Sequence, residues 1–157
     1  MEDDPAFEPE AILAALNARG VRYVVVGGFA VAAHGVVRAT ADLDLVVELE
    51  WENAAALAAA LVAIDARDLE ERRSAITQES LVRRADRRLR TRHGEVHLLN
   101  GVDGVPRYGQ LLPATVVKLN DEHVPVACLA DLKAMKRATG RLKDRADIAE
   151  LDALENG

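Results

Sequence analysis

Residues 24–48 form the segment that most restricts the folds open to this chain. Their sequence, VVVGGFAVAAHGVVRATADLDLVVE, contains two aliphatic runs separated by a Gly-Gly pair and a stretch of small residues. Asp42 and Asp44 lie in the second run, although burying a carboxylate costs several kcal/mol unless something compensates it. Because residues i and i+2 of a strand point to the same face, the two carboxylates project together, opposite Leu43 and Leu45. The segment therefore predicts a strand, a glycine turn, a short helix and a second strand that presents paired carboxylates.

The remaining pattern interleaves helices with hairpins. Apolar residues at helical spacing predict helices over 8–19, 51–65, 78–88, 129–139 and 143–154. Hairpins are predicted over 89–100, around His93-Gly94, and over 114–129, around Asn120-Asp121. We therefore expect an α/β (α+β) fold in which a mixed, mostly antiparallel sheet is flanked by helices, and the chain ends in a helical pair.

Length and composition limit the class of protein. A chain of 157 residues suits one domain over 1–157, and we expect residues 1–7 of the acidic N-terminus to be disordered. Half of the residues are hydrophobic but only 3% are aromatic, so Ala, Val and Leu must build the core. The net charge of −6 argues against a protein that binds nucleic acid through its overall charge, so such a contact would need a local patch.

Cysteine usage and hydropathy indicate the compartment. The single cysteine, Cys128, excludes an internal disulfide and fits a reducing environment. No stretch resembles a signal peptide, and none approaches the roughly 18 apolar residues of a membrane span. We expect a soluble, cytoplasmic protein with no membrane partner.

The paired aspartates and the paired glycines together suggest a ligand. Two carboxylates this close repel each other unless a cation lies between them, and oxygen ligands suit Mg²⁺ or Mn²⁺. Gly27-Gly28, between a strand and a helix, lets the backbone approach a bound anion closely. Solvent-exposed aspartates at a strand end and an ordinary tight turn are the simpler alternative. The combination favours a site for a metal-bound triphosphate over that alternative.

The same residues carry a family resemblance. GGFAVAAHGVVRATADLDLVVE closely resembles the signature of the nucleotidyltransferase superfamily (the DNA polymerase β-like fold), in which Gly-Gly or Gly-Ser precedes Asp-x-Asp. The ending LADLKAMKRATGRLKDRADIAELDAL is similar to that of small bacterial members related to the AbiEii-type toxin nucleotidyltransferases. The resemblance is strong over 22–48, moderate over 94–151 and slight between them. It implies the nucleotidyltransferase fold, with Asp42 and Asp44 as ligands of Mg²⁺ (or Mn²⁺) and an NTP as co-substrate.

A third carboxylate that the family usually carries on a neighbouring strand is missing. In the matching stretch, GEVHLLNG, His97 stands where the aspartate is expected. His97 serves as a general base or as a Mn²⁺ ligand in one interpretation, because imidazole titrates near neutrality and binds transition metals. In a second, Glu95 supplies the carboxylate from the same strand face. In a third, the site is degenerate and binds a nucleotide without transferring it.

Further charged and polar residues are expected around the nucleotide. Arg38 and Thr40 lie just ahead of Asp42, where a guanidinium can bind phosphate oxygens. The resemblance of the ending implies that Lys136 and Asp144 complete the nucleotide site. The alternative for these residues is an ordinary role at the mouth of a loop or on the surface of a helix.

A cluster of six arginines lies in residues 83–93 of this acidic chain. Arg83, Arg84, Arg87 and Arg88 would form one basic helical face that can follow a nucleic-acid backbone. No aromatic residues interleave with them, so stacking on single-stranded bases is not supported. A solvated face paired with nearby glutamates is the alternative.

The resemblance implies transfer of NMP from an NTP to an acceptor hydroxyl of tRNA or of a protein. It also suggests a toxin–antitoxin or defence module, with a cognate antitoxin or toxin protein as a partner. Two rivals stay open. One is a nucleotidyltransferase that modifies a small molecule such as an antibiotic. The other is a catalytically degenerate nucleotide-binding or partner protein, which gains support from His97.

Overall fold

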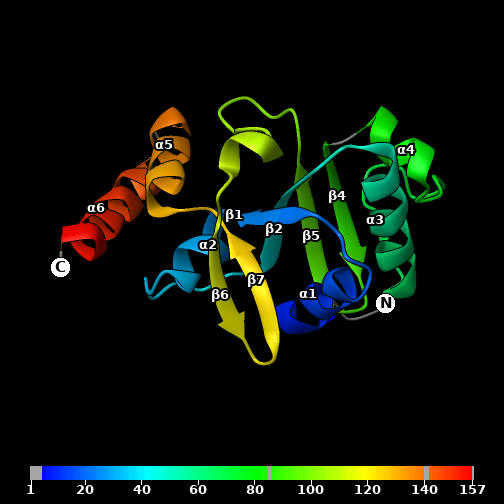
Figure 1. The fold of residues 1–157 in the computed structure, drawn as a ribbon, viewed down its shortest axis with the longest axis horizontal. Helices are drawn as coiled ribbons and strands as arrows, with labels where there is room; N and C mark the ends of the chain where they lie inside the picture. The colour runs from blue at the N-terminus through cyan, green and yellow to red at the C-terminus, as the bar shows by residue number, and fades with distance from the viewer. Residues whose placement is uncertain (1–4, 85, 140–141, 157) are drawn as a thin grey trace.

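The computed structural model describes residues 5–84, 86–139 and 142–156, and at 139 and 142–144 it describes the backbone alone. A seven-stranded sheet occupies its centre, in the order β3-β4-β5-β2-β1-β7-β6 (Figure 1). The strands are β1 (Tyr23–Val26), β2 (Asp42–Val47), β3 (Arg67–Asp68), β4 (Asp86–Thr91), β5 (Gly94–Leu99), β6 (Thr115–Leu119) and β7 (Glu122–Val126).

The sheet is mixed and mostly antiparallel, as expected. The pairs β3–β4, β4–β5, β1–β2 and β6–β7 are antiparallel, whereas β2–β5 and β1–β7 are parallel. Both predicted hairpins are present, with Thr91 opposite Gly94 in one and Leu119 opposite Glu122 in the other. The central position of β2 matters most for function, because it places the paired aspartates between β1 and β5.

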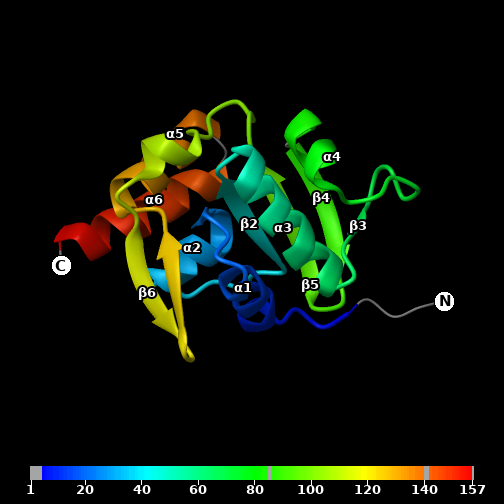
Figure 2. The same ribbon diagram turned by 45° about the vertical axis from the view of Figure 1, so that its right-hand side comes forward.

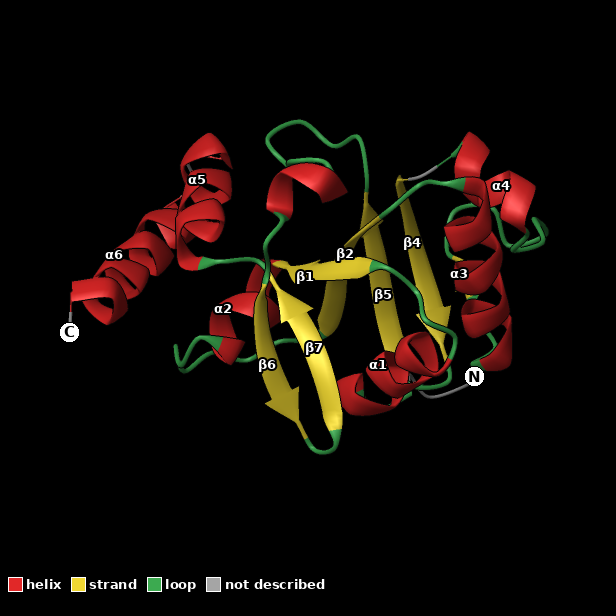
Figure 3. Ribbon diagram, viewed as in Figure 1, coloured by secondary structure: helices red, strands yellow, loops and turns green. Residues whose placement is uncertain are grey.

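Helices flank the sheet, with α1 and α2 on opposite sides of it (Figure 3). They are α1 (Pro9–Ala18), α2 (Gly27–Ala33), α3 (Trp51–Ala63), α4 (Gln78–Arg83), α5 (Leu129–Thr139) and α6 (Leu142–Asn156), with a 3₁₀ helix at Tyr108–Leu111. Helices α1 and α3 contact each other and cover one face of the sheet (Figure 2). Helices α5 and α6 form the expected C-terminal pair, and α5 also contacts α2.

Local sequence explains how the first elements form. Helix α1 begins at Pro9, whose fixed φ suits the first turn, and it buries Ile12, Leu13 and Leu16 along one stripe. The helix is followed by Gly20, which has a φ of +65°. The four residues of β1 are all buried, so this strand lies at the centre of a single cluster of buried apolar side chains.

The helix predicted over 78–88 is wrong in its second half. Helix α4 has a capping box in which Thr77 and Ser80 exchange side-chain hydrogen bonds, but it ends at Arg83 and strand β4 begins at Asp86. Exposed and buried residues alternate along β4, so the segment follows the two-residue period of a strand. The arginines of this segment fit the period of a helix as well as that of a strand. Pairing with β5 makes the segment a strand.

The described part of the chain includes Phe7, which lies ahead of α1. Phe7 packs edge-on against Phe29, with ring centroids 6.5 Å apart, and it lies against Gly94. Residues 1–4 lie outside the described part of the chain, and the expected disorder of 1–7 stays a prediction. Among the described residues, none of the helices combines the length and apolar character that crossing a bilayer requires.

Candidate functional site

The sheet register brings four ionisable side chains together on one face. Asp42 and Asp44 are half-buried on β2, and Leu43 and Leu45 between and after them are fully buried on the other face. Strand β5 runs parallel to β2, with Glu95 beside Asp42 and His97 beside Asp44. Residues that are 50 positions apart or more in the sequence thus form one cluster, as the two-residue period of each strand requires.

His97 lies in the middle of this cluster. Its Nδ1 is 3.3 Å from Asp44 Oδ1, and its Nε2 is 3.7 Å from Asp42 Oδ2 and 3.4 Å from Glu95 Oε2. The imidazole side chain is only 19% exposed. Three carboxylates therefore surround one imidazole.

This arrangement shifts the ionisation of two members of the cluster. The contact with Asp44 raises the pKa of His97, helped by the charge of Asp42 and opposed by burial. Burial raises the pKa of Asp42, and the neighbouring charge of Asp44 raises it further. When it is protonated, His97 is the local counter-charge of the carboxylates.

The donor set fits a divalent cation. One ligand atom each from Asp42, Glu95 and His97 lies within 4.8 Å of the others. Asp44 Oδ1 is buried and makes no hydrogen bond among the described residues, although His97 Nδ1 lies 3.3 Å from it, so a lone pair is left for a further ligand. Carboxylates suit Mg²⁺ and Mn²⁺, whereas an imidazole favours transition metals, so the mixture favours Mn²⁺ over Mg²⁺. The group therefore contains the predicted pair, Asp42 and Asp44, and also Glu95 and His97 of β5, for which the sequence leaves alternative roles open.

Gly27 is required at the junction of β1 and α2. Its φ is +71°, and an added Cβ would lie 2.0 Å from Asp44 Oδ2. At Gly28 an added Cβ would lie 3.3 Å from both Arg38 Nε and Thr40 Cγ2. The paired glycines therefore let the backbone pass directly beside the carboxylate of Asp44 and the side chains of the following loop.

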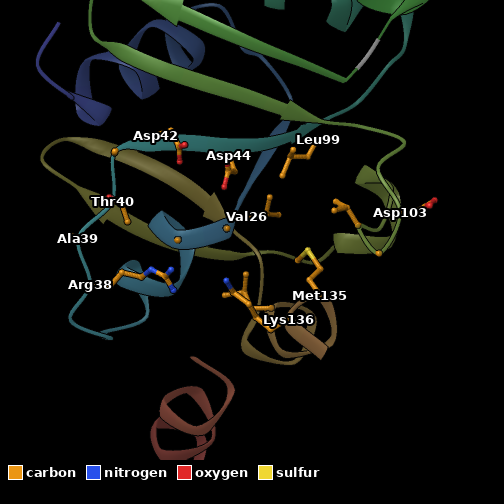
Figure 4. Close-up of a pocket in the computed structure, with 16 residues that line it drawn as sticks. Val26, Arg38, Ala39, Thr40, Asp42, Asp44, Leu99, Asp103, Met135 and Lys136 are labelled. Carbon is orange, nitrogen blue, oxygen red and sulfur yellow. The ribbon is translucent and has the colours of Figure 1, made fainter. Parts of the chain in front are cut away.

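A pocket of about 420 Å³ opens beside the aspartates (Figure 4). Its wall includes seven of the residues predicted for a nucleotide site: Gly27, Gly28, Arg38, Thr40, Asp42, Asp44 and Lys136. In Figure 4 the aspartates project into the pocket from β2, and the nitrogens of Arg38 and Lys136 face it from the opposite side. The volume falls within the ~300–1,000 Å³ of small-molecule sites. Cations and carboxylates therefore face each other across a space large enough for a ligand.

Asp147 on α6 is a member of this site that the sequence did not reveal. Its Oδ2 pairs with Arg38 and lies 3.1 Å from Lys136 Nζ. Burial alone would raise the pKa of Asp147, but the two cations outweigh burial and hold that pKa below its usual range. Its spacing could have identified it from the sequence. Asp147 follows the predicted Asp144 by three residues, so the two share a face of the helix. The side chain of Asp144 itself lies outside the described part of the structure.

Sequence reasoning also missed the wall contributed by the loop after β5. Asp103, Gly104 and Val105 line the pocket together with Met135 of α5. These residues carry no motif, and only the fold brings the loop over the ends of β2 and β5. No local pattern in the sequence would have identified them.

The four arginines predicted to form a helical basic face are separated by the structure. Arg87 is buried and pairs with Asp68, and its Nη2 donates to Ser80 O at 2.6 Å. Arg84 pairs with Asp68 and Glu71, whereas Arg83 is exposed on α4. Arg88 lies on the other face of β4, 3.7 Å from Glu95. The single helical face is therefore wrong, because β4 sends alternate residues to opposite sides of the sheet.

Comparison with known proteins adds no identification. No protein-family model matches the sequence, and a search of curated proteins found no match.

Proposed function

We propose that this protein is a metal-dependent nucleotidyltransferase that moves NMP from an NTP to an acceptor hydroxyl. One observation carries the proposal. The carboxylate–imidazole cluster of β2 and β5 borders a pocket whose other wall holds Gly27, Gly28, Arg38 and Lys136. A triphosphate needs this combination, since a divalent cation and fixed positive charges must together neutralise its phosphates.

Asp42 and Asp44, together with Glu95 or His97, would hold the cation, and the other of these two β5 side chains would then act as the base. When bound, a Mg²⁺ or Mn²⁺ ion would supply positive charge at the reacting phosphate and lower the pKa of a coordinated hydroxyl. The chain's own residues supply the rest. Arg38 and Lys136 would bind phosphate oxygens, and the backbone at Gly27 and Gly28 would approach the phosphates without steric hindrance. Because α2 has only seven residues, the side chains of the pocket carry this assignment rather than the helix dipole.

The reaction itself is an in-line substitution at the α-phosphorus. The acceptor oxygen forms a bond to that phosphorus as the bond to the bridging oxygen breaks, and pyrophosphate leaves. Glu95 or His97 would take the proton of the hydroxyl. Positioning and charge neutralisation are the main contributions of the protein in such a transfer. The resemblance to toxin-type enzymes motivates tRNA or a protein as the acceptor and a toxin–antitoxin or defence context, and both are part of the proposal.

A second function, nucleotide binding without transfer, is favoured by a specific observation. His97 stands at the centre of the cluster where the family resemblance expects a carboxylate, and Asp147 already pairs with both Arg38 and Lys136. A protein in that state would bind a nucleotide only by exchanging Asp147 for phosphate. Release of pyrophosphate separates the two functions, because only the transferase produces it.

The test is transfer of label from each α-³²P-labelled NTP, with Mg²⁺ or Mn²⁺, in the presence and absence of total tRNA. The wild type is compared with Asp42→Asn, which keeps the shape of the side chain, and with Asp121→Asn in the exposed β6–β7 turn as a matched control. We expect label on an acceptor and pyrophosphate release that Asp42→Asn reduces by at least ~100-fold and that the control leaves unchanged. NTP binding with no pyrophosphate release under any condition would instead establish the non-catalytic function.

A further inference from the structure

The open face of the sheet carries a row of arginines beside the carboxylate–imidazole cluster. Strand β4 presents Arg88 opposite His97 and Arg90 opposite Glu95, and Arg67 of β3 lies opposite Arg90. Directly opposed residues of neighbouring strands project to the same face. Arg67, Arg88 and Arg90, here called the arginine row, therefore share a face with Glu95, His97, Asp42 and Asp44.

This face is open to solvent along β4. The side chains of Arg88 and Arg90 are 54% and 41% exposed, and Arg67 is exposed, whereas Arg87 and Leu89 on the other face are buried. The face that α3 covers is thus distinct from the face that carries the arginine row. A partner can reach the row without any rearrangement of the described helices.

The charges of the row differ in how far they are balanced within the protein. Arg88 and Arg90 both lie near the carboxylate of Glu95, at 3.7 and 3.6 Å, and Arg90 has a further interaction besides. Arg67 has no ion-pair partner among the described residues, yet it lies directly opposite Arg90. Like charges at directly opposed positions of a sheet are destabilising. An arrangement that costs stability in an acidic protein indicates that an anion binds there.

The row extends into a hollow at the edge of the sheet. A depression of about 410 Å³ is lined by Arg67 and Arg90 together with Arg72 and Arg92. Arg92 is partly neutralised by Asp65 at 2.9 Å, and Arg72 is exposed. Arginines thus continue from the carboxylate–imidazole cluster to the β3 edge along the neighbouring strands β4 and β3, although Asp65 and Asp68 also line the hollow.

The position of the arginine row indicates whether it would bind the nucleotide or the acceptor. The pocket with Arg38 and Lys136 lies on the α2 and α5 side of Asp42 and Asp44, and the arginine row lies on the β5 side. An anion held by the row would therefore reach the carboxylate–imidazole cluster from the side opposite the nucleotide. That is the direction from which an acceptor hydroxyl must approach.

We propose that the arginine row binds the phosphate backbone of a nucleic-acid acceptor and directs its hydroxyl to the carboxylate–imidazole cluster. The hydroxyl's role rests on the proposed function, whereas binding to the row does not. Guanidinium groups bind phosphate oxygens through paired hydrogen bonds. With no aromatic residue in the row, the contact is to the backbone and independent of base sequence.

A nucleic acid fits this surface better than an acidic protein does. Protein interfaces usually contain an apolar core with aromatic or aliphatic anchors. The large apolar side chains exposed on the described structure, Val37, Leu49, Trp51, Val62, Val82, Leu112, Val116 and Leu154, all lie outside β3, β4 and β5. A surface of arginines without apolar anchors is typical of contacts to a phosphate backbone.

The test measures binding of a fluorescently labelled single-stranded RNA by anisotropy over a range of salt concentrations, with chelator and without NTP. The double variant Arg67→Gln/Arg90→Gln is compared with the wild type. The control, Arg19→Gln/Arg83→Gln, removes the same charge from two exposed arginines on α4 and just after α1. We expect the row variant to raise Kd about tenfold or more and to reduce the slope of log K against log salt by about 1.4, two contacts at ~0.7 each. The control should keep the wild-type slope.

Two results would overturn the proposal. One is a row variant whose Kd and salt slope match those of the control. The other is poly-glutamate that displaces the RNA as effectively as unlabelled RNA of equal charge, which would assign the row to an acidic protein.

Label transfer measured on the same samples separates this proposal from the proposed function. Loss of RNA binding in the row variant supports the surface even if the wild type transfers no NMP. Undiminished RNA binding and transfer in the row variant would refute the surface while the transferase function stands.

Discussion

At the residue scale, the site depends on a close contact between the backbone of residue 27 and the carboxylate of Asp44, which only glycine permits. Gly27 and Gly20 both have a positive φ, but only Gly27 lies against another residue. A substitution at either position costs about 1–2 kcal/mol in backbone strain. At Gly27 the clash with Asp44 adds to this cost.

Gly27→Ala is therefore expected to lower the free energy of unfolding by at least ~1 kcal/mol more than Gly20→Ala does. It should also abolish Mn²⁺ binding, because Asp44 must move to make room for the methyl group. Urea unfolding and Mn²⁺ titration measure the two effects. Equal losses of stability in the two variants would contradict a steric clash between a Cβ at residue 27 and the carboxylate of Asp44.

The nitrogen ligand of His97 sets the metal preference. His97→Asp replaces imidazole by a carboxylate, so the affinity ratio of Mn²⁺ to Mg²⁺ is expected to fall about tenfold. Calorimetric titration with each ion measures the ratio. His123→Asp, an exposed position on β7, makes the same chemical change away from the site and serves as the control. A ratio that His97→Asp leaves unaltered would remove His97 from the set of ligands.

At the scale of elements, α6 connects to the pocket through one carboxylate. Asp147 is paired with Arg38 of the α2–β2 loop and Lys136 of α5, whereas Asp152, on the same helix, pairs with Lys133 at 2.7 Å away from the pocket. Asp147 therefore pairs with Arg38 and Lys136, the two cations to which the proposed function assigns phosphate binding.

Asp147→Asn is expected to strengthen binding of a non-hydrolysable ATP analogue about three- to tenfold, or roughly 0.7–1.4 kcal/mol. The reason is that a competing negative charge disappears from the phosphate side of the pocket. Asp152→Asn should leave the affinity unchanged. Weaker binding in Asp147→Asn would show that this carboxylate positions Arg38 and Lys136 rather than competing with the ligand.

The separation of the arginines is also decided at this scale. Asp68 accepts hydrogen bonds from the backbone N–H groups of Glu70 and Glu71 and pairs with Arg84 and Arg87. Burial alone would raise the pKa of Asp68, but these backbone hydrogen bonds and Arg84 hold it below its usual range. A single buried carboxylate thus ties β3, α4 and β4 together.

At the scale of the whole molecule, these lowered pKa values determine how stability depends on pH. Asp68 and Asp147 bind protons less readily in the folded state than in the unfolded chain. Their contribution to stability is therefore complete above the unfolded pKa of about 4 and is lost as the pH falls through the lower folded values.

We expect the free energy of unfolding to fall steeply below about pH 4, where Asp68 and Asp147 become protonated. It should also decline as the pH rises above about 6.5, because the raised pKa of His97 contributes stability only while the imidazole is protonated. Asp68→Asn should cost about 3 kcal/mol at pH 7, because Arg87 stays buried without its carboxylate. The same variant should lose less stability than the wild type between neutral and acidic pH. Urea unfolding over a pH series tests both effects, with Asp121→Asn as a control, and parallel pH profiles would contradict the role given to Asp68.

Most of the fold was accessible from local pattern. Alternation identified β2, both hairpins and the shared face of Glu95 and His97, and helical spacing identified α1, α3 and the C-terminal pair. The prediction failed at 86–88, where the two-residue period of β4 is set by its pairing with β5 rather than by its own side chains.

The sequence by itself determined which residues lie side by side within a single strand or turn. Asp42 must project with Asp44, Glu95 must project with His97, and Gly27 must lie beside the strand that precedes it. The parallel pairing of β2 with β5, the return of α6 to Arg38, and the alignment of Arg67 with Arg90 were decided only by the tertiary structure. The physical reason is that strand order and helix docking depend on packing between distant segments, which the periodicity of a single segment does not encode.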